Sequence, residues 1–252
     1  MKTVYVCKDS FENILCAVYD AWLEREEVRL VMEGERNLEL FCIYIEEETD
    51  EEKALKVSRS IKNQISDEVW SLAYKASLSC DPDRADKIFR FLKLAFRYGP
   101  KITDQMALPE VFDIFAVCRF VDNETHLITQ FTRFSQMEGG ILAGRIGPKN
   151  DITVLAAPYF ADRLPEENWI LYDEKHRKAA VHRGGAGWIL VREDSDEWEK
   201  RLGKHTDEEE YRDLWRVFHE SISIKERENP VCQRGHLPLR YRPYMTEFQN
   251  KG

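Results

Sequence analysis

The sequence lacks the cysteine patterns by which most metal and redox sites are recognised. Its six cysteines are scattered with no CxxC or CxxxCxxC pair, so neither a zinc site nor an iron–sulfur cluster is indicated. Five of the six lie within apolar patterns, which favours buried thiols over disulfides or metal ligands. We therefore expect no metal and no cofactor.

Familiar enzyme motifs are also missing. The sequence contains no GxxxxGK[ST] phosphate loop, no HExxH, no GxSxG and no deaminase-type H-x-E followed by PCxxC, so no reaction class is assigned by motif. Its glycine-rich pieces have a simpler interpretation. "GGILAGRIG" predicts a turn leading into a strand, and "HRGGAGW" predicts a hairpin.

Long apolar runs are absent as well. No stretch approaches the roughly 18 apolar residues of a membrane helix, and the first residues do not resemble a secretory signal, so we expect a cytoplasmic protein without a membrane partner. Twelve glycines and nine prolines are too few for a disordered or fibrous chain. With 252 residues and 43% hydrophobic content, the chain can bury a full core. Without a convincing linker, we expect one domain, 1–252.

Local patterns predict an α+β fold, with a mixed or antiparallel sheet and several packed helices. Ser10 is expected to cap the first helix, Thr49 and Glu52 to form a capping box, and Thr206 to cap the last helix. A helix before Gly99-Pro100 should end there. Strands are expected at 3–7, 28–32, 38–45, 141–147, 168–173, 178–182 and 187–191, and helices at 11–24, 50–66, 67–79, 83–99, 110–137, 154–164 and 207–228.

A basic stripe is predicted on the helix at 83–99. Between Arg84 and Lys101 there are six basic residues against one acid, Asp86, although the whole chain has a formal net charge of −9. Such a stripe could bind phosphates, or it could be an ordinary solvated helix face. Helical spacing places four of its cations on one flank: Lys87, Arg90, Lys93 and Arg97.

The long helix at 110–137 carries a second candidate. Glu124 falls in the middle of its apolar face, where a carboxylate must be paired or be costly to desolvate. One interpretation is a buried ion pair with an arginine from elsewhere. The other is a carboxylate in a pocket, which would recognise the edge of a base or act with His126 in acid–base chemistry. Five polar residues of this helix, spaced alternately four and three positions apart, share one face and form a polar ladder that could hydrogen-bond an external partner. They are Arg119, Asn123, His126, Gln130 and Arg133.

The third candidate is the C-terminal segment 229–245, "NPVCQRGHLPLRYRPYM". Its three prolines favour an extended strap. Arginines interleaved with aromatic rings suit phosphate contact and base stacking. Alternatively, the strap is a clamp whose arginines pair with the chain's own acids, Glu124 or those of 193–210. The strap residues expected to contact nucleic acid are Arg234, His236, Arg240, Tyr241 and Arg242.

Taken in order, several long blocks resemble a bacterial family of DNA-metabolism and DNA-repair proteins built on a domain of unknown function. The resemblance runs from about Ser10 to Phe248 and is weakest around 193–206. It is carried by "SFENILCAVYDAW", "IFRFLKLAFRYG", "VCRFVDNETHLITQFTRFSQMEGGILAGRIGPKNDITVLAAPYFADRLPEENWILYDEKHRKAAVH" and "LWRVFHESISIKERENPVCQRGHLPLRYRPYMTEF". The family has no established catalytic residues, but its pattern includes positions matching Arg119, Glu124, His126, Phe131, Arg133, Phe134, Asn229, Pro230, Gln233, Pro238, Arg240 and Tyr241.

The resemblance implies a role in DNA repair beside a radical-SAM protein similar to spore photoproduct lyase, and some members are fused to a uracil-DNA-glycosylase-like domain. Because this chain lacks the three-cysteine pattern of a radical-SAM cluster, that chemistry would belong to the partner. Our leading hypothesis is an accessory protein that binds DNA in a local basic cleft formed by the 84–101 stripe, the ladder from Arg119 to Arg133 and the C-terminal strap. The alternatives are an enzyme acting on nucleic acid through Glu124 and His126, and a protein adaptor that never contacts DNA.

Overall fold

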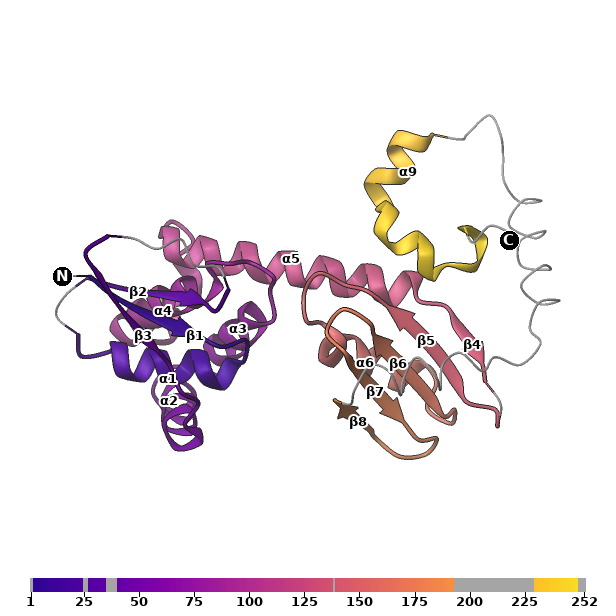
Figure 1. Cartoon of the computed structure of the whole chain (residues 1–252), viewed down its shortest axis with the longest axis horizontal. Coiled ribbons are helices and arrows are strands. Elements are labelled where there is room, and N and C mark those ends of the chain that lie inside the picture. The colour runs from indigo at the N-terminus through magenta and orange to yellow at the C-terminus, as the bar shows by residue number, and fades with distance from the viewer. Residues whose placement is uncertain (1, 25–26, 35–39, 138, 193–228, 249–252) are drawn as a thin grey trace. The chain divides into compact units, whose positions relative to one another are not determined.

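The computed structural model describes residues 2–24, 27–34, 40–137, 139–192 and 229–248 (Figure 1). The expected α+β fold is confirmed, with one parallel and one mixed sheet. The chain forms two compact units, unit 1 (residues 1–122) and unit 2 (residues 123–252). That both belong to one domain, 1–252, stays a prediction. The helix predicted at 207–228 and its cap Thr206 lie outside the described residues.

Unit 1 is built on a three-stranded parallel sheet of order β2-β1-β3. Strand β1 has buried side chains on both faces, as its β-branched and aromatic residues favour. It pairs in parallel with β2, where Thr3 lies opposite Val28, and with β3, where Thr3 lies opposite Ile43. The elements of this unit are β1 (Lys2–Cys7), α1 (Phe11–Ala21), β2 (Val28–Met32), β3 (Cys42–Glu46), α2 (Glu51–Gln64), α3 (Asp67–Ser77), α4 (Arg84–Tyr98) and η1 (Gly99–Asp104), and α5 (Pro109–Phe131) begins in it.

Most of the predicted helix ends in unit 1 are confirmed. The Ser10 hydroxyl accepts the Asn13 N–H at 3.1 Å, and α4 ends before Gly99, which has a φ of 72°. The predicted capping box was wrong, because α2 is capped by Asp50, whose carboxylate accepts the N–H groups of two residues in the first turn at 2.8 and 3.1 Å. Thr49 instead accepts a hydrogen bond from the Asn13 amide, so a tertiary contact uses its hydroxyl.

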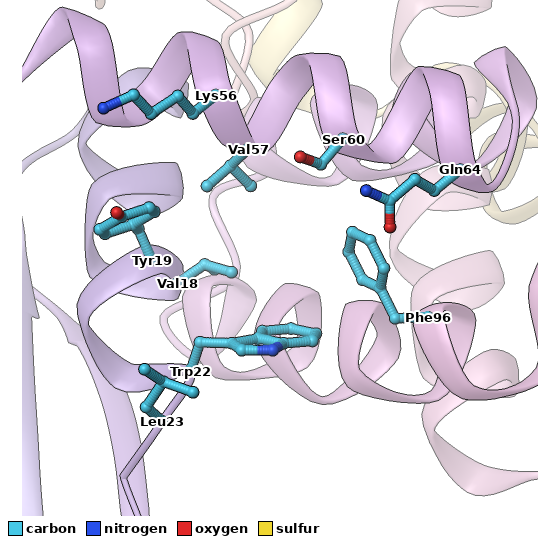
Figure 2. Close-up of a pocket in the computed structure, with 9 residues that line it drawn as sticks. All are labelled: Val18, Tyr19, Trp22, Leu23, Lys56, Val57, Ser60, Gln64 and Phe96. Carbon is cyan, nitrogen blue, oxygen red and sulfur yellow. The ribbon is translucent and has the colours of Figure 1, made fainter.

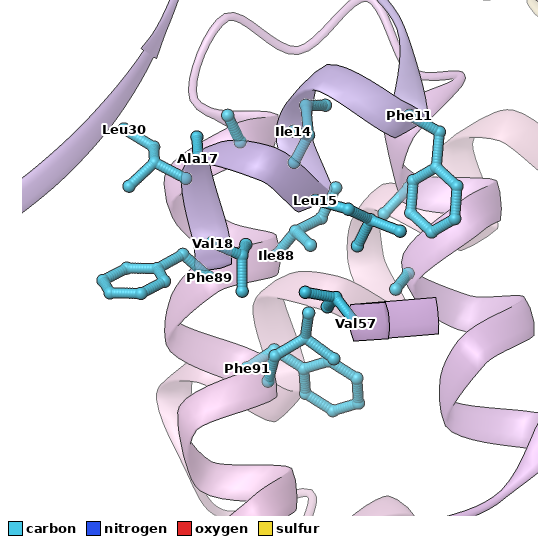
Figure 3. Packing of buried hydrophobic residues seen from close by; sticks show 14 of the residues in the cluster. Phe11, Ile14, Leu15, Ala17, Val18, Leu30, Val57, Ile88, Phe89 and Phe91 are labelled. Carbon is cyan, nitrogen blue, oxygen red and sulfur yellow. The ribbon is translucent and has the colours of Figure 1, made fainter. Parts of the chain in front are cut away.

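Helices α1 and α4 supply much of the unit 1 core (Figure 3). Ile14 and Leu15 of α1 and Ile88 and Phe91 of α4 are almost completely buried. Val57 of α2 packs into the same cluster. Each fully buried large side chain contributes about 1.5–3 kcal/mol of hydrophobic stabilisation, which makes this cluster the main support of the unit.

Unit 2 contains a five-stranded mixed sheet of order β4-β5-β6-β7-β8. Only β5 and β6 are parallel among its neighbouring strands, so a helical crossover, α6, joins them. The polar residues that follow the carboxyl ends of β5 and β6 therefore meet at one edge of the sheet. The elements are β4 (Phe134–Gln136), β5 (Leu142–Ile146), α6 (Thr153–Arg163), β6 (Trp169–Asp173), β7 (Lys178–His182), β8 (Trp188–Val191), α9 (Pro230–His236), η3 (Leu239–Tyr244) and η4 (Thr246–Phe248).

Two predicted elements differ from the structure. The long helix ends at Phe131 rather than at 137, because Phe134–Gln136 form β4 and pair with β5; Gly139 and Gly140, with φ of 85° and 78°, make the predicted turn. The strap is helical rather than extended. Proline at the first position of a helix is compatible with its geometry, and the Asn229 side chain accepts the Cys232 N–H at 3.0 Å.

Among the described helices, none combines the length and apolar character that crossing a bilayer requires.

Candidate functional site

A single buried carboxylate ties three segments of unit 2 together. Glu124 of α5 is 2% exposed. Its Oε1 accepts the backbone N–H of Lys149 at 3.0 Å, the Arg240 guanidinium at 2.9 Å and the Tyr241 hydroxyl at 3.0 Å. Its Oε2 accepts both the backbone and the side-chain amide of Asn150 at 2.7 Å. Helix α5, the loop after β5 and the strap therefore meet at one side chain.

The interpretation of Glu124 as part of a buried ion pair is confirmed. Arg240 of the strap is the partner, and its guanidinium also lies over the Tyr241 ring at 4.6 Å. Burial, together with the charge of Glu124, raises the pKa of Tyr241 to about 12, so the phenol remains a donor. Because both oxygens of Glu124 are occupied and almost inaccessible, the geometry favours an anchor over a proton acceptor for substrate.

The polar ladder lies mostly on the exposed side of α5. Arg119, Asn123, His126 and Gln130 are exposed, and the ring Nε2 of His126 lies 2.7 Å from the Gln130 amide. Arg133 follows the end of the helix, and its guanidinium donates to Glu247 at 2.8 Å. The ladder can therefore offer amide and imidazole groups to a partner, whereas its last arginine holds η4, the segment that follows the strap.

The basic stripe on α4 is largely paired within unit 1. Lys87 contacts Asp81 at 2.7 Å, and Arg90 contacts Asp86 at 2.6 Å. Lys93 lies over the Phe89 ring. Such pairing lowers the positive potential that the stripe presents to a phosphate. The remaining contacts involve Arg84, which contacts Asp9 at 2.6 Å, and Arg97, which lies over the Tyr98 ring.

The strap divides into exposed and anchored residues. Arg234 and His236 of α9 are exposed. Tyr241 is buried, and the guanidinium of Arg242 lies 4.6 Å from the Phe248 ring centroid. The structure thus supports the clamp interpretation for Arg240 and leaves α9 as the solvent-facing part.

A second polar cluster lies where β5 and β6 end, and sequence reasoning missed it. Asp173 is fully buried and accepts the Thr153 hydroxyl at 3.1 Å. It also accepts the backbone N–H of His176 at 3.1 Å and contacts the ring Nδ1 of His176 at 2.7 Å. Lys178, also buried, pairs with Asp151. In the sequence, this cluster could have been predicted from the run "DEKHRK", which begins where the strand "WILYD" ends.

This cluster offers a donor set for a metal ion. Ligand atoms of Asp151, Asp173 and His176 all lie within 4.8 Å of one another, and carboxylates with an imidazole suit divalent cations. The ammonium of Lys178 already supplies a positive charge to Asp151. Charge compensation within the cluster is therefore achieved by the protein itself.

Cations surround this edge of the sheet. We define the carboxyl-end surface as Arg145, Lys149, Lys175, Arg177 and Arg240. The Lys175 ammonium donates to the Lys149 carbonyl at 2.8 Å, so the loops after β5 and β6 are held together. Lys149, Lys175 and Arg177 are exposed, and none forms an ion pair with a residue that the structure describes.

Glu174 connects the strap to the same surface. Its carboxylate accepts the Tyr244 hydroxyl at 3.1 Å and lies 3.5 Å from Arg145. Burial and the charge of Glu174 raise the pKa of Tyr244 to about 12. An exposed edge that combines cations, a half-buried tyrosine and backbone groups can bind an anionic polymer.

Residues 82–247 of the sequence match a domain of unknown function, DUF4130. This match covers the carboxyl-end surface and the whole strap. The chain matches none of the curated proteins with which it was compared.

Proposed function

The chain belongs to the family defined by the domain of unknown function DUF4130, and on that premise we propose that it is a DNA-metabolism accessory protein. In this proposal it binds nucleic acid through the carboxyl-end surface of unit 2. The supporting observation is the set of exposed cations Lys149, Lys175 and Arg177 on two loops joined by a hydrogen bond. The resemblance of the sequence to DNA-repair proteins supports DNA as the polymer.

The pattern of ion pairs favours this surface over α4. Phosphate binding requires cations whose charge is not already used. Lys87 and Arg90 of α4 contact carboxylates of their own unit. By contrast, the ammonium groups of Lys149 and Lys175 form no ion pair with a carboxylate of the described residues, so the two loops keep their charge for a ligand.

Binding of a labelled single-stranded and a labelled duplex oligonucleotide, at about 50 mM and about 200 mM salt, tests the proposal. The double variant Lys149→Gln, Lys175→Gln should bind more weakly and lower the slope of log affinity against log salt by roughly 2, because two phosphate contacts are lost. The matched control is Arg163→Gln, Arg183→Gln. Arg163 ends α6 and Arg183 follows β7, at the opposite edge of the same sheet, so this control should bind normally.

A second double variant tests which surface binds the oligonucleotide. Arg90→Gln with Arg97→Gln on α4 should weaken binding less than the loop variant, because Arg90 is already paired with Asp86. A larger loss from the α4 pair would overturn the proposed location. Absent or salt-insensitive binding of both oligonucleotides would overturn nucleic-acid binding and favour the adaptor role.

We also propose that the protein acts beside a radical-SAM enzyme similar to spore photoproduct lyase. The sequence has no three-cysteine cluster motif, so the radical chemistry would come from that enzyme. Co-expression of the two chains, followed by affinity purification under anaerobic conditions, should recover both in a constant ratio. Recovery of the tagged chain alone, at protein concentrations well above those in the cell, would refute the partnership.

The polar cluster beside the carboxyl-end surface favours a second candidate, an enzyme acting on nucleic acid. Asp173 holds the Nδ1 side of the His176 ring, an arrangement that fixes an imidazole for proton transfer through its other nitrogen. In this candidate His176 replaces Glu124 and His126 as the proton-transfer group. His176→Gln should then abolish product formation from damaged oligonucleotides without weakening their binding, and an active His176→Gln protein would exclude the assignment.

A further inference from the structure

Unit 1 contains an open pocket of about 380 Å³ between helices α1, α2 and α4 (Figure 2). Small-molecule sites typically measure about 300–1,000 Å³, so the space suits one compact ligand. Apart from Phe96, its lining comes from residues before the segment that matches DUF4130. The pocket therefore shares no lining residue with the surface for which we proposed nucleic-acid binding, and its ligand does not depend on that proposal.

Aromatic rings form the side of the pocket opposite α2. Figure 2 shows the indole of Trp22 and the ring of Phe96 facing the space beneath that helix. The two rings meet edge to face, with centroids 5.0 Å apart and an interplanar angle of 73°. Tyr19 closes one end, and Val18 and Val57 add aliphatic contact. A flat, apolar ring system is the shape that these walls accommodate best.

Apart from the Tyr19 hydroxyl and the Trp22 indole N–H, the polar side-chain groups of the lining lie on the α2 side. Lys56, Ser60 and Gln64 follow a spacing of four, so they lie in one row along the helix. Lys56 and Gln64 are separated by two turns, about 12 Å. Lys56 is exposed and forms no ion pair with any described residue. The row therefore presents a cation at one end, a hydroxyl in the middle and an amide at the other end.

We propose that this pocket binds a nucleotide, with the base against Trp22 and Phe96 and the phosphate near Lys56. Base–aromatic contacts account for the ring-lined wall, because every base has a π-face that can stack. The Gln64 amide can both donate to and accept from the edge of a base. An uncharged apolar ligand would use the rings but would leave the Lys56 ammonium and the Gln64 amide without a role.

Calorimetric titration of the full chain with AMP, adenosine and inorganic phosphate tests the proposal. AMP should bind saturably, adenosine more weakly, and phosphate alone should not bind measurably, because the rings provide part of the affinity. Lys56→Gln should weaken AMP binding by about tenfold or more, the effect of one charge-assisted hydrogen bond, and leave adenosine binding unchanged. Gln64→Ala should weaken the binding of AMP and adenosine alike.

Arg59→Gln is the matched control. Arg59 is an exposed cation on the same helix that does not line the pocket, so its replacement should leave AMP binding unchanged. Equal weakening by Lys56→Gln and Arg59→Gln would show general charge attraction and overturn the site. Absence of saturable binding by AMP, GMP, CMP and UMP at millimolar concentrations would also overturn it.

Two sources could supply this chemistry, a free nucleotide or an unstacked residue of a single strand. A short oligoadenylate without a terminal phosphate distinguishes the two sources. If the oligoadenylate competes with AMP, and Lys56→Gln weakens its binding, the ligand is a residue of a strand. If it does not compete, the ligand is a free nucleotide. The variant Lys149→Gln, Lys175→Gln of unit 2 should retain AMP binding. Failure of oligonucleotide binding in unit 2 and failure of nucleotide binding in unit 1 would therefore be observed separately.

Discussion

At the scale of single residues, Glu124 has the largest expected effect on stability. It accepts five hydrogen bonds from Lys149, Asn150, Arg240 and Tyr241. Replacing it by alanine leaves a guanidinium, a phenol and three amide groups without their acceptor. Because removing one partner of a buried ion pair is costly, Glu124→Ala should lower the free energy of unfolding by about 3–5 kcal/mol.

Urea unfolding measures this loss, with Gln130→Ala as the control. Gln130 is an exposed residue near the end of the same helix, so its replacement should change the unfolding free energy by less than about 0.5 kcal/mol. A stable Glu124→Ala protein, within about 1 kcal/mol of the parent, would contradict the anchoring role.

Glu47 makes the stability of unit 1 depend on pH. It is 4% exposed, and burial, together with the carboxylate of Asp20, raises the pKa of Glu47 from 4.5 to about 7. The folded state therefore keeps this proton to higher pH than the unfolded state does. The resulting stabilisation is fully present below about pH 4.5 and is lost as pH rises to about 7, for a total of about 3 kcal/mol.

Glu47→Gln removes this dependence. The amide cannot ionise, so the variant should match the parent near pH 4.5 and be more stable than the parent at pH 8. Thermal unfolding at the two pH values, with the exposed neighbour Glu48 changed to glutamine as a control, measures the difference. If the parent and the Glu47→Gln variant respond equally to pH, the carboxyl of Glu47 titrates normally.

At the scale of elements, the strap packs closely on the loop after β5. A Cβ on Gly147 would meet the Tyr244 hydroxyl and would lie 2.9 Å from Cζ of that ring. Gly147→Ala should therefore displace the ring and break its hydrogen bond to Glu174, at a cost of about 1–2 kcal/mol in unfolding free energy. In a Tyr244→Leu background the same change should cost much less.

Gly187→Ala is the control for this prediction. It lies in the turn before β8, and an added Cβ would contact nothing within 4 Å. Urea unfolding of the parent, the two single variants and the double variant gives the coupling energy between positions 147 and 244. Equal costs of Gly147→Ala with and without the tyrosine ring would show that the strap does not press on this loop.

Two of the differences between predicted and observed elements share a physical cause. Helical periodicity continued past Phe131, yet Phe134–Gln136 gained a strand partner in β5. Likewise, Thr49 fits a cap position, but its hydroxyl accepts a hydrogen bond from Asn13. Where local preference is weak, a tertiary hydrogen bond or sheet pairing decides the element. Where one residue type is required, as at Gly99 with its positive φ, the prediction succeeded.

At the scale of the whole molecule, the cysteines differ in their exposure to solvent. Cys7, Cys16 and Cys118 are buried, whereas Cys80 and Cys232 are exposed, so the expectation of buried thiols holds for only part of the set. Burial raises the pKa of Cys7 and of Cys118 to about 12. A thiol reagent at pH 7.5 should therefore modify the two exposed cysteines first, because the thiolate is the reactive form.

Labelling followed by peptide mass mapping checks this order. Urea should release the buried thiols, and the variant Cys80→Ser, Cys232→Ser should lack the fast phase. Rapid labelling of Cys7 or Cys118 in the folded protein would contradict their burial in the core.

Features that depend on neighbours along the chain were predictable without the fold. The strand and helix patterns, the Ser10 cap and the stop at Gly99 follow from local sterics and hydrogen bonding. The position of Glu124 on an apolar face also showed that it had to find a partner. These are properties of a few consecutive turns and need no knowledge of the fold.

Which distant groups contact one another was visible only in the folded chain. Glu124 and Arg240 are 116 positions apart, and the loops that bring Lys149 beside Lys175 are joined by parallel pairing of β5 with β6. The ion pairs of the α4 stripe also depend on distant segments, because Arg84 pairs with the carboxylate of Asp9. Charge pairing depends on distances of a few ångströms between distant segments, and no local pattern contains those distances.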